Sequence, residues 1–273
     1  MLPWIEPDHN PTIRVLSLGA GVQSTVLALM AAREEIGPMP DCAIFADTQW
    51  EPASIYDHID WLETQLPFPV HRVTAGNIRQ DQIDKRNTTG QSFSSMPYYT
   101  ANGAMGKRQC TREYKVEPIQ RKIRELLGFG KGKRIPKGVF AEQWIGISQD
   151  ELQRVKNARK KWQVNRWPLL EKKMSRQDCL DKWQSWGMNR KLEKSACIGC
   201  PFHQNDLWRD MKINDPVSWK DACDFDDAIR DGTMKEKQFL HRSLKPLSKA
   251  DIDSAEDKGQ ISFLGECEGM CGI

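Results

Sequence analysis

The chain has 273 residues, with 40 Lys and Arg against 37 Asp and Glu, which gives a formal net charge of +3. Hydrophobic residues make up 39% and charged residues 28%, a composition that excludes disordered, collagen-like and membrane-spanning proteins. No stretch approaches the ~20 apolar residues of a spanning helix, and the first residues lack the pattern of a secretory signal, so we expect a cytoplasmic protein without a membrane partner.

Strands and helices alternate in the first part of the chain. Short apolar runs predict strands at residues 13–18, 42–46 and 69–73. Helix-forming and amphipathic segments between them predict helices at residues 26–33 and 54–66. The alternation predicts an α/β fold with a doubly wound, mostly parallel sheet that has helices on both faces.

The rest of the chain is less regular. Residues 77–106 are polar and predict a long loop. Beyond them the patterns predict a helix at 116–127, a strand at 139–147 and one helix within 168–186. After Cys200 the chain is acidic and rich in turn residues, and no clean strand pattern follows.

A glycine loop separates the first predicted strand from the first predicted helix. It runs Gly19-Ala20-Gly21-Val22-Gln23-Ser24-Thr25. Glycines let the backbone approach an anion closely, and the start of a helix supplies unpaired N–H groups. The loop lacks the ending of a Walker A loop and the third Gly of the dinucleotide fingerprint. Two interpretations stay open from the loop alone, a phosphate-binding loop and a tight turn whose small residues serve packing.

The loop resembles the PP-loop of the adenine-nucleotide alpha-hydrolase superfamily, whose usual form is Ser-Gly-Gly-x-Asp-Ser. Here Gly19 replaces the first Ser and Gln23 replaces the Asp. Four later stretches resemble the phosphoadenosine phosphosulfate (PAPS) reductase branch of that superfamily, in chain order. They are Phe45-Ala46-Asp47-Thr48-Gln49-Trp50-Glu51, Arg108-Gln109-Cys110-Thr111 with Lys115 and Pro118, Gly146-Ile147-Ser148-Gln149-Asp150-Glu151 with Arg154, and Trp167-Pro168-Leu169-Leu170 with Asp178.

The resemblance implies a site for ATP or PAPS, with Mg²⁺ near Asp47. The residues that it places at the nucleotide are Ser17, Gly19, Ala20, Gly21, Gln23, Ser24, Thr25, Asp47, Thr48, Gly146 and Arg154. Arg112 and Lys115 are expected to neutralise a phosphate or sulfate. Asp47, Lys115 and Cys267 are the expected catalytic residues. The alternatives are a helix-capping role for Asp47 and ordinary solvated charge for the two cations.

Two cysteine pairs stand out among the eight cysteines. Cys197 and Cys200 form a Cys-x-x-Cys, and Cys267 and Cys271 lie at the end of the chain. Four thiolates match a [4Fe–4S] cluster or a structural Zn²⁺, while redox-active dithiols and unrelated thiols are the alternatives. The resemblance favours iron–sulfur, and His203 is an alternative ligand. Cys267 also follows a Glu, as the nucleophile of sulfonucleotide reductases does, but a metal-bound Cys267 cannot be that nucleophile in the same state.

Positive charge is concentrated in two segments. Residues 107–137 hold eleven Lys and Arg against three Glu, and residues 151–173 hold eight against two, whereas residues 205–273 are acidic. Trp162 and Trp167 lie among the basic residues, where an exposed Trp can stack a base. The pattern favours a nucleic-acid partner, tRNA or DNA, against a solvated surface with buried tryptophans.

The resemblance implies a nucleotide-binding domain at residues 1–190 and, packed on it, a helical, metal- or cluster-binding extension with the cysteines at residues 191–273. The leading hypothesis is an ATP-dependent enzyme that cleaves at the α-phosphate, releases pyrophosphate and couples this activation to sulfur transfer onto a nucleic acid, with a sulfur donor as partner. One alternative is a PAPS reductase that reduces its substrate to sulfite through Cys267 with a thioredoxin-like reductant. The other is a non-catalytic nucleotide- or nucleic-acid-binding module, which the departures at Gly19 and Gln23 motivate.

Overall fold

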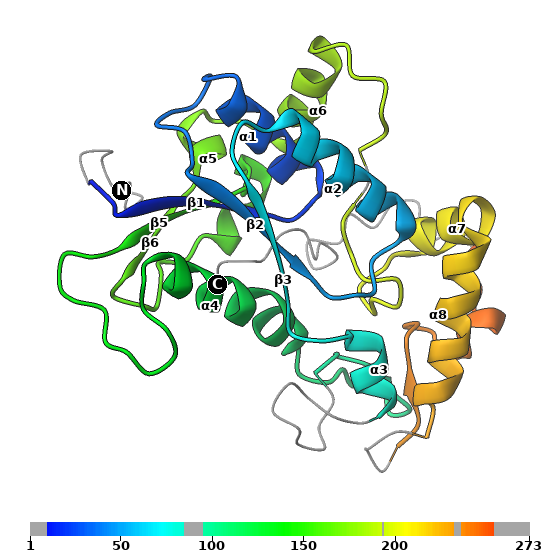
Figure 1. Ribbon diagram of the computed structural model, residues 1–273. Helices are drawn as coiled ribbons and strands as arrows, with labels where there is room; N and C mark the ends of the chain where they lie inside the picture. The colour runs from blue at the N-terminus through cyan, green and yellow to red at the C-terminus, as the bar shows by residue number, and fades with distance from the viewer. Residues whose placement is uncertain (1–9, 85–94, 193, 232–235, 254–273) are drawn as a thin grey trace.

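A five-stranded sheet forms the centre of the computed structural model, which describes residues 10–84, 95–192, 194–231 and 236–253 (Figure 1). The strand order is β3-β2-β1-β5-β6, and every neighbouring pair is parallel. The strands are β1 (Ile13–Leu18), β2 (Cys42–Asp47), β3 (Val70–Thr74), β5 (Ala141–Ile145) and β6 (Gln163–Arg166). The predicted α/β fold with a parallel sheet is therefore confirmed.

Helices cover both faces of this sheet, because alternate side chains of its strands point to opposite sides. In β2, Ala43 and Phe45 face one core and Ile44 and Ala46 face the other. The helices on the first side are α1 (Val22–Ala32), α2 (Ala53–Gln65), α5 (Pro168–Glu171) and α6 (Arg176–Ser185). On the second side α4 (Glu117–Leu126) buries Ile119 and contributes to the other core (Figure 1).

A third apolar core lies beside the sheet and is built around Trp50, Trp208 and Phe225, all buried. The elements that surround it are α3 (Ile78–Ile83), α7 (Asn205–Asn214), α8 (Pro216–Ile229), the antiparallel pair β4 (Tyr99–Thr100) and β7 (Gln238–Phe239), and the short 3₁₀ turn Leu247–Lys249. Residues from before and after position 190 contribute to this core. Within the described residues, no helix is long and apolar enough to cross a membrane.

Three parts of the chain differ from the predicted elements. The polar segment 77–106 contains α3 and β4, so it is not one long loop. The single helix predicted within 168–186 is two helices, because Lys173 adopts φ 55° and Ser175 begins α6 with a capping box to Asp178. A third difference is that β6 was not predicted at all.

The strand β6 escaped prediction because its buried positions are polar. Gln163 and Asn165 are both buried, and the Gln163 Nε2 amide donates to Gln143 Oε1 at 2.6 Å and to Asn165 Oδ1 at 2.9 Å. These hydrogen bonds compensate for the desolvation of the amides. The segment therefore lacks the apolar signal on which strand prediction depends.

Candidate active site

The predicted site lies at the carboxyl end of β1, where the strand order changes direction because β2 and β5 lie on opposite sides of β1. β1 is flanked by β2 on one side and β5 on the other, and ligands of open α/β sheets bind beyond the carboxyl ends of strands at such a point. The loop after β1 and Gly146 after β5 meet here. A Cβ atom on Gly146 would lie 3.1 Å from the backbone N and Cα of Ser24, so a larger residue here would press on the backbone of α1.

The glycine loop holds a strained turn before α1. Ala20 adopts φ 59°, a left-handed conformation that L residues rarely take. Gly21 is the N-cap of α1, and no side chain caps this helix, so the polar start of α1 depends on other partners. Ser24 Oγ donates to the Gly21 carbonyl at 3.2 Å. Backbone N–H groups are therefore the donors that this loop can offer an anion.

Gln23, at the first turn of α1, connects the loop to the segment after β5. Its Nε2 lies 3.4 Å from Ser148 Oγ and 3.4 Å from Glu151 Oε2, and its Oε1 accepts from Arg176 Nη1 at 3.2 Å. Arg154 forms an ion pair with Glu151. Gln23 thus ties α1 to the short 3₁₀ segment Gln149–Arg154, in a position where the superfamily usually has Asp.

Ser17 and Asp47 take different structural roles. Ser17 lies inside the sheet, where its Oγ contacts Gln143. Asp47 lies at the end of β2, and its Oδ1 accepts from the Gln49 backbone N–H at 2.7 Å and from the Tyr56 hydroxyl at 2.9 Å. Burial and the hydrogen bond to Asp47 raise the pKa of Tyr56, so that hydroxyl stays a donor. Gln49 has φ 58°, so this second strand-to-helix turn is strained as well.

A buried carboxylate, Glu51, is the centre of the site. Its Oε1 lies 3.4 Å from Lys115 Nζ, 3.4 Å from Thr48 Oγ1 and 4.0 Å from Cys197 Sγ, and its Oε2 lies 3.5 Å from Ser195 Oγ. The Glu51 side chain is 0% exposed and that of Lys115 is 7% exposed. The sequence assigned no role to Glu51, although it ends the quoted Asp-Thr-Gln-Trp-Glu stretch and that pattern was the available signal.

Lys115 reaches this centre from a π-helical turn, Thr111–Val116, directly before α4. Such turns are rare and are frequent at functional sites. The same turn directs Arg112 to solvent, where its side chain is 60% exposed and lies 3.4 Å from Glu113 and 3.4 Å from Glu117. The structure therefore brings one of the two predicted anion-binding cations into the site and leaves the other outside it.

The Cys197–Cys200 turn packs against the end of β2. The backbone N–H of Ile198 donates to the Trp50 carbonyl at 2.9 Å, and Thr48 Oγ1 lies 3.3 Å from Cys197 Sγ. Cys197 and Cys200 line one small cavity together with Lys115. Within the described part of the chain, no three His, Cys, Asp or Glu side chains form a group that could hold a metal ion. The other predicted ligands, Cys267 and Cys271, lie outside the described residues.

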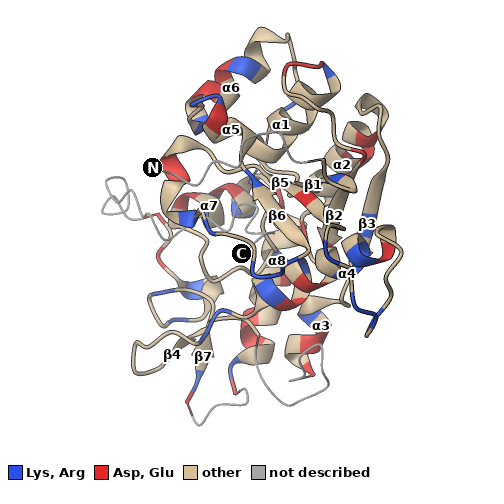
Figure 2. Cartoon of the chain, turned by 90° about the vertical axis from the view of Figure 1, so that its left-hand side faces the viewer, with Lys and Arg blue, Asp and Glu red and all other residues tan. Residues whose placement is uncertain are grey.

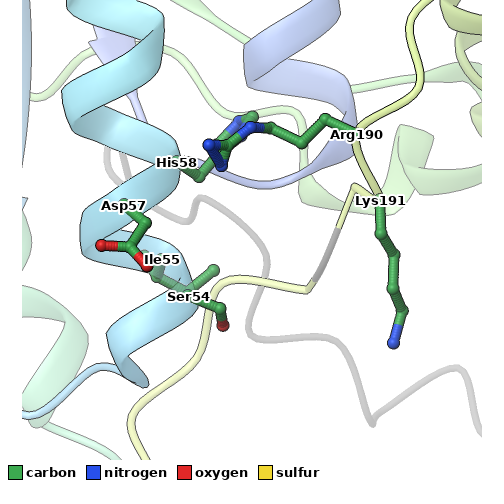
Figure 3. Close-up of a pocket in the computed structure, with 6 residues that line it drawn as sticks. All are labelled: Ser54, Ile55, Asp57, His58, Arg190 and Lys191. Atoms are coloured by element: carbon green, nitrogen blue, oxygen red, sulfur yellow. The ribbon is translucent and has the colours of Figure 1, made fainter.

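A pocket of about 200 Å³ lies between α2 and the segment that precedes the cysteine turn (Figure 3). Its lining residues are Ser54, Ile55, Asp57, His58, Arg190 and Lys191. His58 is buried, and its Nε2 lies 2.9 Å from Thr25 Oγ1. Burial, with a smaller contribution from Arg190, lowers the pKa of His58 to about 4. A neutral His58 therefore joins α2 to the first turn of α1, a role that the sequence did not indicate.

The two tryptophans of the basic segments have different environments. Trp167 is buried, 4% exposed, so it packs in the protein core and is not available to stack a base. Trp162 is half-buried, and the guanidinium of Arg124 lies 5.8 Å from its ring centroid. The expectation of base stacking is thus wrong for Trp167 and stays a prediction for Trp162.

Among the comparisons with known proteins, the family model agrees with the sequence motifs. The family model of the phosphoadenosine phosphosulfate reductase domain matches residues 13–182. A crystal structure of phosphoadenylyl-sulfate (PAPS) reductase from Candida auris, in a phosphate complex, is similar to the chain with a TM-score of 0.43 and 13% sequence identity. That alignment covers 67% of this chain and 82% of the other. No curated protein sequence matches the chain significantly.

Proposed function

The chain belongs to the phosphoadenosine phosphosulfate reductase family, and from this premise we propose that it is an enzyme that binds an adenine nucleotide at the glycine loop. One observation carries the proposal, namely the approach of Gly146 to the first turn of α1 at the carboxyl edge of the sheet. At this contact the backbone of Gly146 packs closely against the first turn of α1, whose N-terminus has no side-chain cap. Such an edge suits the phosphates of a nucleotide.

Different site residues would bind the phosphates of the nucleotide and its Mg²⁺ ion. The N–H groups at the start of α1 would hold a phosphate, and Lys115 would add a positive charge from the opposite side. Mg²⁺ is usually held by one or two carboxylates together with substrate phosphates. The carboxylate of Asp47, fixed at the end of β2 by Gln49 and Tyr56, fits that requirement and would hold Mg²⁺, which supplies charge neutralisation at the phosphates when bound.

The reaction that we propose is ATP-dependent activation coupled to sulfur transfer onto a nucleic acid. An acceptor oxygen attacks the α-phosphorus of ATP, the bond to the β-phosphate breaks and pyrophosphate leaves. A sulfur nucleophile from a donor then displaces AMP from the adenylated acceptor. The Sγ of Cys197 lies 4.0 Å from Glu51 Oε1, so this cysteine stands at the proposed site. It would position the sulfur there as a free thiol only in a state in which it does not ligate a metal.

PAPS reduction is a second candidate, and the family match favours it. In that reaction the Cys267 thiolate attacks the sulfur of PAPS, adenosine 3′,5′-bisphosphate leaves, and a dithiol reductant then releases sulfite from the cysteine. The third candidate is a module that binds ATP without turning it over, which the substitution of Gln23 for the usual Asp motivates.

The four cysteines Cys197, Cys200, Cys267 and Cys271 are our proposed ligands for a [4Fe–4S] cluster, with Zn²⁺ as the alternative. Cys197 and Cys200 fit half of that set, because they lie in one cavity and the Cys200 N–H donates to the Cys197 carbonyl at 3.0 Å. Protein purified without oxygen should then contain about four irons, and Cys197→Ser should lose them. Retention of all iron by that variant would contradict the ligand set.

The decisive experiment measures binding and product together. ATP and PAPS are titrated into the full chain, and pyrophosphate and sulfite are assayed with and without RNA, DNA and a dithiol. Pyrophosphate release that depends on nucleic acid supports the leading reaction, sulfite supports the second, and binding without product supports the third. Asp47→Asn should weaken Mg²⁺-dependent nucleotide binding about tenfold or more, with the exposed Asp181→Asn on α6 as control. Equal nucleotide affinity of both variants would contradict the site.

A further inference from the structure

A basic groove lies at the opposite edge of the sheet from the candidate active site. It is formed by the loop that leads into β5 and the turn that leads into β6, and its volume is about 560 Å³. Figure 1 shows the first of these loops at the left-hand end of the sheet, far from α7 and α8, and Figure 2 views the molecule from that end. The residues that line the groove are Arg134, Ile135, Pro136, Lys137, Gly138, Val139, Phe140, Lys161, Trp162 and Val164.

The charge of this groove is of one sign. Neither residues 126–141 nor residues 155–165 contain an Asp or Glu. Eight cations in these segments have no carboxylate partner among the described residues, in contrast with paired cations such as Arg72 and Arg166. The eight are Lys131, Lys133, Arg134, Lys137, Lys156, Arg159, Lys160 and Lys161. Their charge is therefore available to an external anion.

Hydrogen bonds of Arg124 hold the loop that forms one wall of the groove. The guanidinium of Arg124, on α4, donates to the carbonyls of Gly130 at 3.0 Å and Lys133 at 2.5 Å, and it lies 5.8 Å from the centroid of the Trp162 ring. The backbone N–H of Ala141 donates to the Trp162 carbonyl at 2.9 Å. Arg124 thus fixes the basic loop and the half-buried indole relative to each other, while its neighbours keep their charges exposed.

We propose that this groove binds a single-stranded nucleic acid, whose phosphates contact Arg134, Lys137 and Lys161 and whose bases stack at Trp162. A positive track beside an aromatic ring is the arrangement that single strands recognise. The volume lies within the range of ligand pockets, so several groups of the strand fit at once. The inference deepens the proposed function, because a nucleic acid is the acceptor there, and it adds a docking site about 17 Å away, the length of five strand residues.

The test measures binding of a labelled 20-nucleotide DNA or RNA strand to the full chain by fluorescence anisotropy. The triple variant Arg134→Gln, Lys137→Gln, Lys161→Gln should weaken binding at least tenfold. It should also reduce the slope of log affinity against log salt by about 2, because each lost phosphate contact in a single strand changes it by about 0.7. Trp162→Leu should weaken binding about tenfold with an unchanged slope. The matched control replaces exposed Lys172, Lys245 and Lys249 by Gln and should change neither quantity.

Three outcomes would overturn the proposal. The first is equal binding by the groove triple and the control triple, both checked for folding by circular dichroism. The second is equally tight binding of heparin, polyglutamate or anionic vesicles with the same losses, which would make the groove a general anion surface. The third is full binding by Trp162→Leu. ATP titration of each variant separates this test from the proposed function, because the groove triple should bind ATP normally whether or not the enzyme transfers sulfur.

Discussion

The two edges of the central sheet use charge in opposite ways. At the carboxyl edge, the charges are buried and paired within the protein, as in Lys115 with Glu51 and Arg154 with Glu151. At the amino edge, cations such as Arg134 and Lys161 are exposed and have no carboxylate partner in the described part of the chain. The difference fits the two proposals, a small-ligand site at the first edge and a binding surface for a nucleic acid at the second.

The contrast has a physical basis in solvation. A buried ion is costly unless it is paired, so Glu51 and Lys115 depend on each other for the stability of the fold. An exposed ion keeps its water, and salt screens its interactions over a Debye length of about 8 Å at physiological ionic strength. Loss of a lysine should therefore have opposite consequences at the two edges.

The largest expected effect is that of Lys115→Met. The variant leaves Glu51 buried without the cation that lies 3.4 Å away. Removing one member of a buried pair costs about 3–5 kcal/mol, so the free energy of unfolding should fall by that amount in urea denaturation. Under the proposed function, nucleotide binding should also weaken, because the cation proposed to help hold the phosphates is gone.

The double variant Glu51→Gln, Lys115→Met provides the control. It removes both charges, so it should recover most of the lost stability but none of the nucleotide affinity. If the single and double variants are equally unstable, the pair does not carry the coupling that its burial implies. Glu51 and Lys115 would then not depend on each other for the stability of the fold.

The second prediction concerns pH and His58. Its pKa is about 4 in the folded protein against 6.5 for an ordinary histidine, so the unfolded chain binds more protons between these values. The stability that neutral His58 contributes is complete above pH 6.5 and is lost as the pH falls toward 4. The loss at pH 4 should be about 3 kcal/mol.

This pH dependence is measured by urea denaturation at pH 7 and pH 4 for the natural chain and for His58→Gln. The variant lacks the titrating group and should lose about 3 kcal/mol less over that interval. His241, whose pKa burial also lowers to about 4, titrates in both proteins and cancels in the difference. Identical losses in both proteins would show that His58 does not stay neutral as its burial requires.

The fold and some residues of the candidate site could be predicted from the sequence. The strands β1, β2 and β3 were predictable because their apolar runs are local, and the glycine loop and Asp47 lie next to them in the chain. The family resemblance added Gly146 and Lys115, which the structure brings near the same edge. Their roles toward a ligand stay predictions.

The remainder depends on contacts that no local pattern encodes. Glu51 becomes the centre of the site only because Lys115, Ser195 and Cys197 arrive from segments distant in the chain. The strand β6 was missed because its buried residues are polar and form hydrogen bonds with one another, as Gln163 does with Gln143 and Asn165. In the sequence such polar residues resemble a loop. Arg112 faces solvent because a π-helical turn changes the usual helical phase.

A third prediction tests the close contact at the carboxyl edge. In Gly146→Ala the new Cβ would lie 3.1 Å from backbone atoms of Ser24, and backbone cannot move as easily as a flexible side chain. Overpacking of this kind costs about 1–3 kcal/mol and should shift the first turn of α1, so ATP affinity should fall with stability. Gly130→Ala is the matched control, because nothing lies within 4 Å of its Cβ position. A fully stable Gly146→Ala with natural ATP affinity would contradict the contact.

The smallest expected effect on stability is that of the groove triple Arg134→Gln, Lys137→Gln, Lys161→Gln. Because these cations repel one another and have no carboxylate partner among the described residues, their removal should raise the free energy of unfolding, by less than about 1 kcal/mol. The gain should be measurable in 20 mM salt and vanish at about 0.5 M, where screening removes the repulsion. Lys115→Met also removes positive charge, yet its effect should be a loss that salt barely changes. If the triple variant instead lost several kcal/mol of its free energy of unfolding, these cations would be needed for the stability of the fold. The proposal that they serve to bind an external anion would then be contradicted.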